Sequence, residues 1–274
     1  MSSWIEIINP KVKLKTGRIK YALIDFDGTI SVIRQGWEDV MIPLMIEMIC
    51  DGNPSTPEIE KEVRDYVDYS TGILTIKQME WLAEAVRRYG IAKKPKSPYE
   101  YKQIYNQRLL VRVEERLKKL RNGELTPDEL MIMGSKDFLE ELYRRNVEMY
   151  LASGTDHEYV LREASALKIT QYFRGGIFGA LDHTEAHTKE RIIQRILDEN
   201  NLSGDELLVV GDGPVEIRNA KARDAIALGV ASDEVRRFGL NPRKRERLIN
   251  AGADLIIPDF TRCEEIIGFL FEKA

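Results

Sequence analysis

Cysteine is scarce in this chain, with only two among 274 residues. Cys50 and Cys263 lie far apart, and each falls within an apolar helical pattern. Reduced, buried thiols fit that setting better than a disulfide or a metal-binding pair does. We therefore expect an apolar core to hold the fold together, for which an apolar content of 43% is sufficient.

The chain also lacks a long uninterrupted apolar run. The longest apolar stretches, such as residues 41–50, are too short to cross a bilayer and are interrupted by Pro43 and Glu47. Residues 1–9 do not show the basic start and long apolar segment of a signal sequence. These absences predict a cytoplasmic protein with no membrane partner.

An excess of basic charge is missing as well, because 41 Lys and Arg face 45 Asp and Glu, a formal net charge of −4. Proteins that bind nucleic acids usually carry a clearly basic domain or stripe, so no nucleic-acid partner is expected. The basic cluster of Arg243, Lys244, Arg245 and Arg247 is interpreted as a solvated helix face. The oligomeric state stays open between monomer and dimer.

Near the N-terminus, an apolar segment at residues 21–24 ends abruptly in acids and a glycine, Asp25–Phe26–Asp27–Gly28–Thr29. This pattern is typical of a buried parallel strand that ends in a loop. Upstream, Val12 and Leu14 alternate with lysines before Thr16 and Gly17. That alternation predicts an edge strand and a turn that lead into the buried strand.

Residues 33–126 show helical periodicity and no buried strand. In the longest helical segment, apolar residues spaced by three or four form one stripe. We interpret this region as a helical cap domain inserted into a core made of residues 1–32 and 127–274. The four expected helices are Trp37–Ile49, Pro57–Tyr69, Thr75–Tyr89 and Pro98–Leu120.

From about residue 127, expected strands and helices alternate along the chain. Repeated strand–helix units imply a parallel sheet that is covered on both faces, so the fold class is α/β with a Rossmann-like core. The expected strands are 147–152, 176–178, 207–210, 225–230 and 253–257, and the expected helices are 136–145, 158–167, 189–199, 215–223, 243–251 and 263–271.

Polar residues follow three of the expected strands. Ligands of open parallel sheets gather at the carboxyl ends of the strands, so these residues are expected to converge on one crevice. The set comprises Asp25 and Asp27 after the first strand, Ser153 and Gly154 after the second, Asp212 and Glu216 after the third, and Lys189 at the start of the preceding helix.

The residue types in this set favour phosphoryl transfer. Crowded carboxylates repel one another and require a cation, and Mg²⁺ is a hard cation that oxygen ligands suit. An aspartate can attack phosphorus, and a second acid two residues away can protonate the leaving alkoxide and then activate water. A lysine, a hydroxyl and backbone N–H groups suit the phosphoryl oxygens.

The same residues carry a family resemblance. Asp25–Phe26–Asp27–Gly28–Thr29 resembles the first motif of the haloacid-dehalogenase superfamily, Ser153 the second, Lys189 the third and Gly211–Asp212–Gly213–Pro214–Val215–Glu216 the fourth. The inserted region resembles the helical cap of the first cap type in that family. The chain is therefore identified as similar to its phosphatases, of the kind that includes phosphoglycolate phosphatases and β-phosphoglucomutases.

The resemblance implies a role for each motif residue. Asp25 would be the nucleophile, and Asp27 the general acid and base. Ser153, Gly154 and Lys189 would bind phosphoryl oxygens. The implied reaction is hydrolysis of a small phosphate monoester, a sugar phosphate or related metabolite, through a phospho-aspartate intermediate.

The resemblance also implies a Mg²⁺ cofactor. The ion would be held by the carboxylate of Asp25, the main-chain carbonyl of Asp27 and the side chain of Asp212, with Glu216 in support. Many members of the family have aspartate where this chain has Glu216. The longer side chain leaves open whether Glu216 binds the metal directly or through water.

Three other functions use the same kind of scaffold. A phosphosugar mutase is the main alternative, and the polar residues of the cap would decide between it and a phosphatase. A dehalogenase does not need the acid at Asp27, and a non-catalytic protein does not need the whole set. The expected specificity elements of the cap are Arg34, Gln35, Trp37 and Ser70–Thr71–Gly72.

Overall fold

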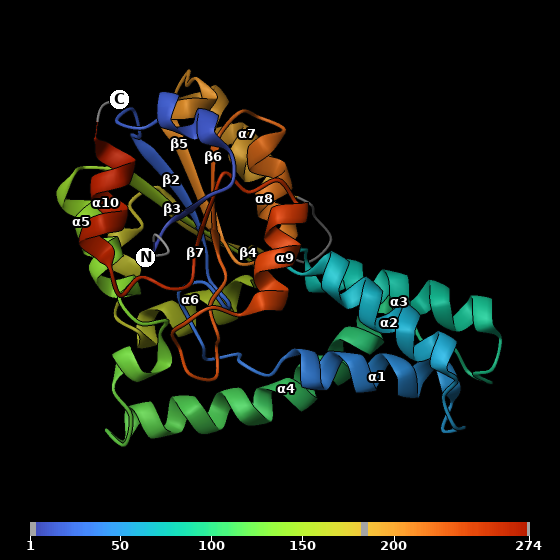
Figure 1. Ribbon diagram of the computed structural model, residues 1–274. Coiled ribbons are helices and arrows are strands. Elements are labelled where there is room, and N and C mark those ends of the chain that lie inside the picture. The colour runs from blue at the N-terminus through green and yellow to red at the C-terminus, as the bar shows by residue number, and fades with distance from the viewer. Residues whose placement is uncertain (1–3, 182–185, 273–274) are drawn as a thin grey trace.

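The computed structural model describes residues 4–181 and 186–272 and shows an α/β core that carries a helical cap on one side (Figure 1). Along the sequence, the cap helices lie between the first and the second buried strands of the core. The predicted fold class is therefore confirmed. Within the described ranges, no helix has both the length and the apolar character that a membrane span requires.

The core is built on a seven-stranded sheet with the order β1-β7-β6-β5-β2-β3-β4. All neighbouring strands pair in parallel except β1, which pairs antiparallel with β7. The order places β2 between β5 and β3, at the centre of the sheet. The strands are β1 (Glu6–Ile7), β2 (Tyr21–Asp25), β3 (Glu148–Asp156), β4 (Gly176–Ala180), β5 (Leu207–Gly211), β6 (Ile226–Val230) and β7 (Leu255–Ile257).

Alternate side chains of the central strands enter two separate apolar clusters, because successive residues of a strand point to opposite faces. In β2, Ala22 and Ile24 join one cluster, whereas Leu23 joins the other. Helices α5, α6 and α10 cover the first face, and α7, α8 and α9 the second (Figure 1). Their bounds are α5 (Ser135–Arg144), α6 (His157–Ala166), α7 (Lys189–Glu199), α8 (Pro214–Lys221), α9 (Pro242–Asn250) and α10 (Cys263–Phe271).

Four helices form the cap, and local signals set their ends. The side chain of Thr56 caps α2 by accepting from the Ile59 N–H, and Ser97 and Glu100 form a capping box that opens α4. Gly90 ends α3 in the left-handed conformation. The bounds are α1 (Glu38–Cys50), α2 (Pro57–Ser70), α3 (Thr75–Tyr89) and α4 (Pro98–Arg121), all within the predicted span 33–126.

The prediction of an edge strand at Val12 and Leu14 is wrong. Residues Pro10–Leu14 form a 3₁₀ helix, η1, and the edge strand is β1. Pro10 cannot donate to a strand ladder, and the Asn9 side chain accepts from the Lys11 N–H and so starts a helical turn. The other short helical turns are η2 (Pro127–Leu130), η3 (Thr170–Tyr172) and η4 (Gly204–Glu206).

The second buried strand is longer than its apolar run. The sequence predicted that it ends at Ala152, but β3 continues to Asp156 with a register shift in its pairing to β4. Residues after Ala152 are polar, so apolar content alone could not show that they stay extended. Both cysteines are free, as predicted, with Cys50 buried and Cys263 half-buried.

Candidate functional site

Asp25 is the last residue of β2 and is buried at the carboxyl end of the sheet. Ala22, Leu23 and Ile24 fill the strand with apolar side chains that are fully buried, so the strand is held rigidly beneath the acid. The Asp25 side chain contacts Lys189, whose Nζ lies 2.6 Å from Oδ1. The hydroxyl of Thr29 donates to the other oxygen, Oδ2, over 3.1 Å.

Lys189 is the first residue of α7 and lies between two carboxylates. Its Nζ is 2.6 Å from Asp25 Oδ1 and 3.0 Å from Glu216 Oε2. Burial opposes the charged form of Lys189, but the two carboxylates reverse that effect and raise its pKa above the usual value. Lys189 is therefore held as a cation directly beside Asp25.

The surroundings of Asp25 disfavour the ionised form of its carboxyl group. Burial raises its pKa well above the usual value, and the charges of Glu216 and Asp212 raise it further, while Lys189 acts in the opposite direction. The single ammonium group of Lys189 is shared between Asp25 and Glu216 and does not fully compensate both carboxylates. An additional cation at this place would favour the ionised form of Asp25.

Asp212 and Glu216 enter the site from β5 and the start of α8. The backbone N–H of Gly213 donates to Glu216 Oε1 over 2.7 Å, which fixes the first turn of the helix. Glu216 is fully buried, and its second oxygen contacts Lys189. Both oxygens of Glu216 are therefore already engaged by protein groups.

The donor set fits a hard divalent cation. One oxygen from each of Asp25, Asp212 and Glu216 lies within 4.8 Å of the others. The Thr29 hydroxyl lies 3.1 Å from Asp25 Oδ2 and 3.4 Å from Asp212 Oδ1, so the two aspartates face each other across it. Clustered carboxylate oxygens of this kind suit Mg²⁺.

Asp27 lies beyond the end of β2 and uses its two oxygens differently. Oδ2 accepts hydrogen bonds from the hydroxyls of Ser153, over 2.9 Å, and Thr155, over 3.1 Å. Oδ1 is buried and has no hydrogen-bond partner among the residues that the structure describes, and Arg34 Nε lies 3.9 Å away. Asp27 thus presents one oxygen that is available to a ligand.

The structure brings all seven predicted site residues to one end of the sheet. Five of them line a common pocket: Asp25, Asp27, Ser153, Gly154 and Asp212. Lys189 and Glu216 lie behind it, in contact with Asp25 and with each other. The convergence predicted from the strand ends is therefore present.

Apart from Thr155 of β3, residues of the predicted cap span supply the rest of the pocket lining. Of the expected specificity elements, Arg34, Trp37, Thr71 and Gly72 line it, together with Ile73, Thr75, Gln78, Tyr105 and Thr155. Two others do not: the Gln35 side chain accepts from Arg116 over 3.0 Å, and the buried Ser70 hydroxyl accepts from Gln78 over 3.2 Å.

Arg34 is buried in this pocket with its charge matched. It makes a two-pronged ion pair with Glu163 of α6, with donor–acceptor distances of 3.0 and 2.6 Å. Glu163 is fully buried, so the pair fixes the guanidinium plane against the core. Sequence reasoning had no signal for Glu163, which lies in an ordinary helical pattern.

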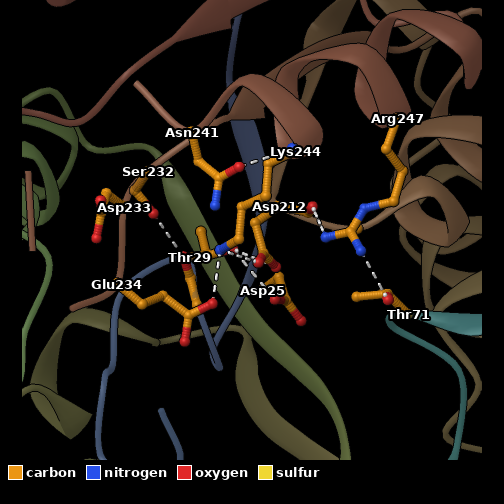
Figure 2. A network of polar contacts seen from close by, with 12 residues as sticks. Asp25, Thr29, Thr71, Asp212, Ser232, Asp233, Glu234, Asn241, Lys244 and Arg247 are labelled. Atoms are coloured by element: carbon orange, nitrogen blue, oxygen red, sulfur yellow. Dashed lines mark hydrogen bonds and ion pairs between the residues drawn. The ribbon is translucent and has the colours of Figure 1, made fainter. Parts of the chain in front are cut away.

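Two basic residues of α9, Lys244 and Arg247, also contact the site, which was not expected from the sequence (Figure 2). Lys244 Nζ lies 2.6 Å from Asp212 Oδ2 and 2.7 Å from Glu234 Oε1. Arg247 donates to the Asp212 carbonyl oxygen over 3.3 Å and to the Thr71 hydroxyl of the cap over 3.0 Å. The expectation of a solvated helix face is wrong for Lys244, which is buried, and holds for the exposed Arg243.

Comparisons with known proteins agree with this architecture. The family model described as haloacid dehalogenase-like hydrolase matches residues 19–223. A predicted phosphatase from Clostridium acetobutylicum superposes with a TM-score of 0.58 at 16% identity, over 91% of this chain and 98% of that one. The comparison with curated proteins finds no match.

Two further solved structures are similar in fold. A predicted phosphoglycolate phosphatase from Haemophilus somnus 129pt has a TM-score of 0.58 at 16% identity, covering 91% of this chain and 98% of its own. A β-phosphoglucomutase from Clostridium difficile has a TM-score of 0.58 at 14% identity, covering 92% and 97%. With the family model spanning most of the chain and all four motifs gathered at one sheet edge, this protein belongs to the haloacid dehalogenase-like hydrolases.

Proposed function

We propose that this hydrolase is a Mg²⁺-dependent phosphatase that cleaves a small phosphate monoester through a phospho-aspartate on Asp25. The observation that carries the proposal is the position of Lys189, 2.6 Å from Asp25 and 3.0 Å from Glu216. A buried nucleophilic carboxylate with a fixed cation beside it suits attack on a phosphoryl group, whose oxygens carry negative charge.

In the first step, an oxygen of Asp25 forms a bond to phosphorus while the bond from phosphorus to the ester oxygen breaks. Asp27 donates a proton to that leaving oxygen, so an alcohol departs. Oδ1 of Asp27, which makes no hydrogen bond with the residues that the structure describes, would carry this proton, because Oδ2 accepts from Ser153 and Thr155. Asp27 must begin this step protonated.

In the second step, water attacks the phosphorus of the acyl phosphate. Asp27, now ionised, takes a proton from that water, and the bond between phosphorus and Asp25 breaks. Inorganic phosphate leaves and the two aspartates return to their starting states. Lys189, the Ser153 hydroxyl and the backbone around Gly154 would hold the phosphoryl oxygens during both steps.

Mg²⁺, when bound, would neutralise phosphoryl oxygens and relieve the repulsion between carboxylates. Asp25, the Asp27 main-chain carbonyl and Asp212 would hold it. Both oxygens of Glu216 already contact protein groups. We therefore propose that Glu216 would support the ion through water and is not a direct ligand.

The pocket favours a small polar substrate, such as a sugar phosphate or a related metabolite. Cap residues Gln78 and Tyr105 line the same pocket as Asp27 and Ser153. The Thr75 hydroxyl donates to the Gly154 carbonyl over 3.3 Å, so the cap is closed directly over the core. A closed cap excludes water during attack by Asp25 and restricts the size of the ester.

A panel of small phosphate monoesters, assayed for inorganic phosphate, tests the proposal. With Mg²⁺ present we expect steady phosphate release from at least one member. Chelation with EDTA should slow release by about a hundredfold or more, since the charge compensation is lost, and added Mg²⁺ should restore it. Turnover that ignores EDTA would contradict the metal requirement.

Product analysis separates the phosphatase from the phosphosugar mutase. A mutase would return the phosphoryl group from Asp25 to another hydroxyl of the sugar, so isomerised sugar phosphate would outpace free phosphate. We expect free phosphate and alcohol in equal amounts. Isomerisation that outruns phosphate release would replace the proposed reaction with the mutase.

A further inference from the structure

The ammonium group of Lys244 is buried against the Asp212 carboxylate. It lies between Asp212 Oδ2, at 2.6 Å, and Glu234 Oε1, at 2.7 Å (Figure 2). The Lys244 residue is 6% exposed. A lysine seldom gives up its hydration unless its charge is matched, and here two carboxylates match it.

The surrounding backbone holds Lys244 in place. The Asn241 side chain accepts from the N–H groups of Arg243 and Lys244, which fixes the first turn of α9. Gly28 packs against the two carboxylates that contact Lys244, because a Cβ at Gly28 would lie 2.4 Å from Asp212 Oδ2 and 3.0 Å from Glu234 Oε1. The contact is therefore part of the built site and not a mobile surface pair.

The two carboxylate oxygens of Asp212 have different partners. Oδ2 is occupied by Lys244, whereas Oδ1 lies 3.4 Å from the Thr29 hydroxyl on the side of Asp25. Only one oxygen of Asp212 is left to face the acidic cluster.

A fixed positive charge beside a metal ligand opposes a second cation on that ligand. Glu234 offsets this opposition, because it contacts the same ammonium group from the other side. We propose that Lys244 and Glu234 together set the Mg²⁺ affinity of Asp212, with Lys244 weakening it and Glu234 strengthening it. This inference rests on the proposed Mg²⁺ site. Lys244 and Glu234 are thus positioning residues that act through Asp212.

Isothermal titration of the full-length protein with MgCl₂, without substrate, tests the proposal at about pH 8, well above the usual pKa of a carboxyl group. Lys244→Met keeps the aliphatic stem but removes the charge, and it should tighten Mg²⁺ binding by about tenfold or more. Glu234→Gln keeps the shape but removes the opposing charge, and it should weaken binding by about tenfold. The matched control Lys61→Met removes the charge of an exposed lysine of α2 and should stay within about threefold of the wild type.

The proposal is supported if Lys244→Met binds Mg²⁺ more tightly than the wild type and Glu234→Gln binds it more weakly. Equal or reversed affinities would overturn it, and if Lys244→Met fails to fold, an unchanged affinity in Glu234→Gln overturns it alone. A wild type that binds no Mg²⁺, or an Asp212→Asn variant that binds it undiminished, would instead refute the proposed metal site. Melting curves in EDTA show whether each variant is folded.

Discussion

At the scale of single residues, the site is a balance between burial and charge around Asp25. Burial and two neighbouring acids raise the pKa of Asp25, and Lys189 opposes them from 2.6 Å. Lys189 in turn keeps its proton because Asp25 and Glu216 raise its pKa. Each group therefore depends on the others for its charge state, and removing one changes the whole cluster.

Replacing Asp25 by Asn should abolish turnover, with a loss of at least about a thousandfold, because the amide cannot attack phosphorus. Asn has nearly the same shape, and Lys189 keeps its contact with Glu216. The variant should therefore fold, with a circular dichroism spectrum like that of the wild type. Steady-state phosphate release measures the effect.

Asp65→Asn is the matched control for this substitution, since Asp65 is an exposed acid of α2 that pairs with Lys61 in the preceding turn. It should leave the rate unchanged. Full activity in Asp25→Asn, or an equal loss in the control, would contradict the assignment of the nucleophile.

At the scale of elements, the end of β3 joins core and cap. Gly154 lies in that strand, and a Cβ there would be 2.1 Å from the Ile73 carbonyl oxygen of the cap. Sequence reasoning explained Gly154 by close approach of a phosphoryl group. The structure adds close approach of the cap backbone, which is a packing reason for the same glycine.

Gly154→Ala should push the cap loop away from the core. We expect an activity loss of about tenfold to a hundredfold, because small displacements of catalytic groups are costly, and about 1–3 kcal/mol of lost stability from overpacking. The kinetics of phosphate release and urea unfolding measure the two effects.

The control is Gly268→Ala in α10, where a Cβ would meet only Glu272 Oε1, at 3.8 Å. Alanine in a helix should stabilise the protein by about 0.5–1 kcal/mol and leave activity unchanged. Equal behaviour of the two variants would show that the contact between Gly154 and Ile73 does not matter.

The turn η4, which leads into β5, contains an acid with a low pKa. A hydrogen bond from Lys20, and further ones from the backbone and hydroxyl of Ser203, lower the pKa of Glu206 from 4.5 to about 2. The folded state therefore binds the proton less tightly than the unfolded state. The resulting stability is present above pH 4.5 and is lost as pH falls toward about 2.

Glu206→Gln should lower the melting temperature at pH 7 by about 2 °C, a modest effect because the ion pair lies near solvent. The difference from the wild type should shrink as the pH is lowered from about 4.5 to about 3. Glu246→Gln, at an exposed position of α9, is the control and should show no such trend. A constant difference across this range would contradict the low pKa of Glu206.

At the scale of the whole molecule, the reaction site lies where two parts of the chain meet. The core provides the acids of the proposed reaction and Lys189, while α3, α4 and the loop between α2 and α3 cover the pocket. Arg247 links the two parts, since it contacts the Asp212 carbonyl and the Thr71 hydroxyl. The cap can therefore select substrates without contributing to the chemistry.

A closed cap should exclude large esters. We expect phosphate release from phosphorylated peptides to be at least about a hundredfold slower than from the best small monoester, because the peptide cannot place its phosphate beside Asp25. Parallel assays at equal concentrations measure the ratio. Comparable rates for both substrate types would contradict the role of the cap.

Much of the fold could be predicted because it depends on local patterns. The apolar run before Asp25, the helical stripes of residues 33–126 and the alternation after residue 127 each predicted elements that the structure contains. Two segments differ from the prediction. Pro10 and Asn9 turned an alternating pattern into η1, and β3 continued through polar residues that carry no apolar signal.

The sequence by itself determined which residues gather at the carboxyl edge of the sheet, because parallel strands must present their ends together. Only the tertiary structure decided how those residues are paired. Asp27 binds Ser153 and Thr155, Glu163 holds Arg34, and Lys244 lies against Asp212. These partners come from distant helices and loops, and a charge that looks solvated along the chain becomes buried only when another element covers it.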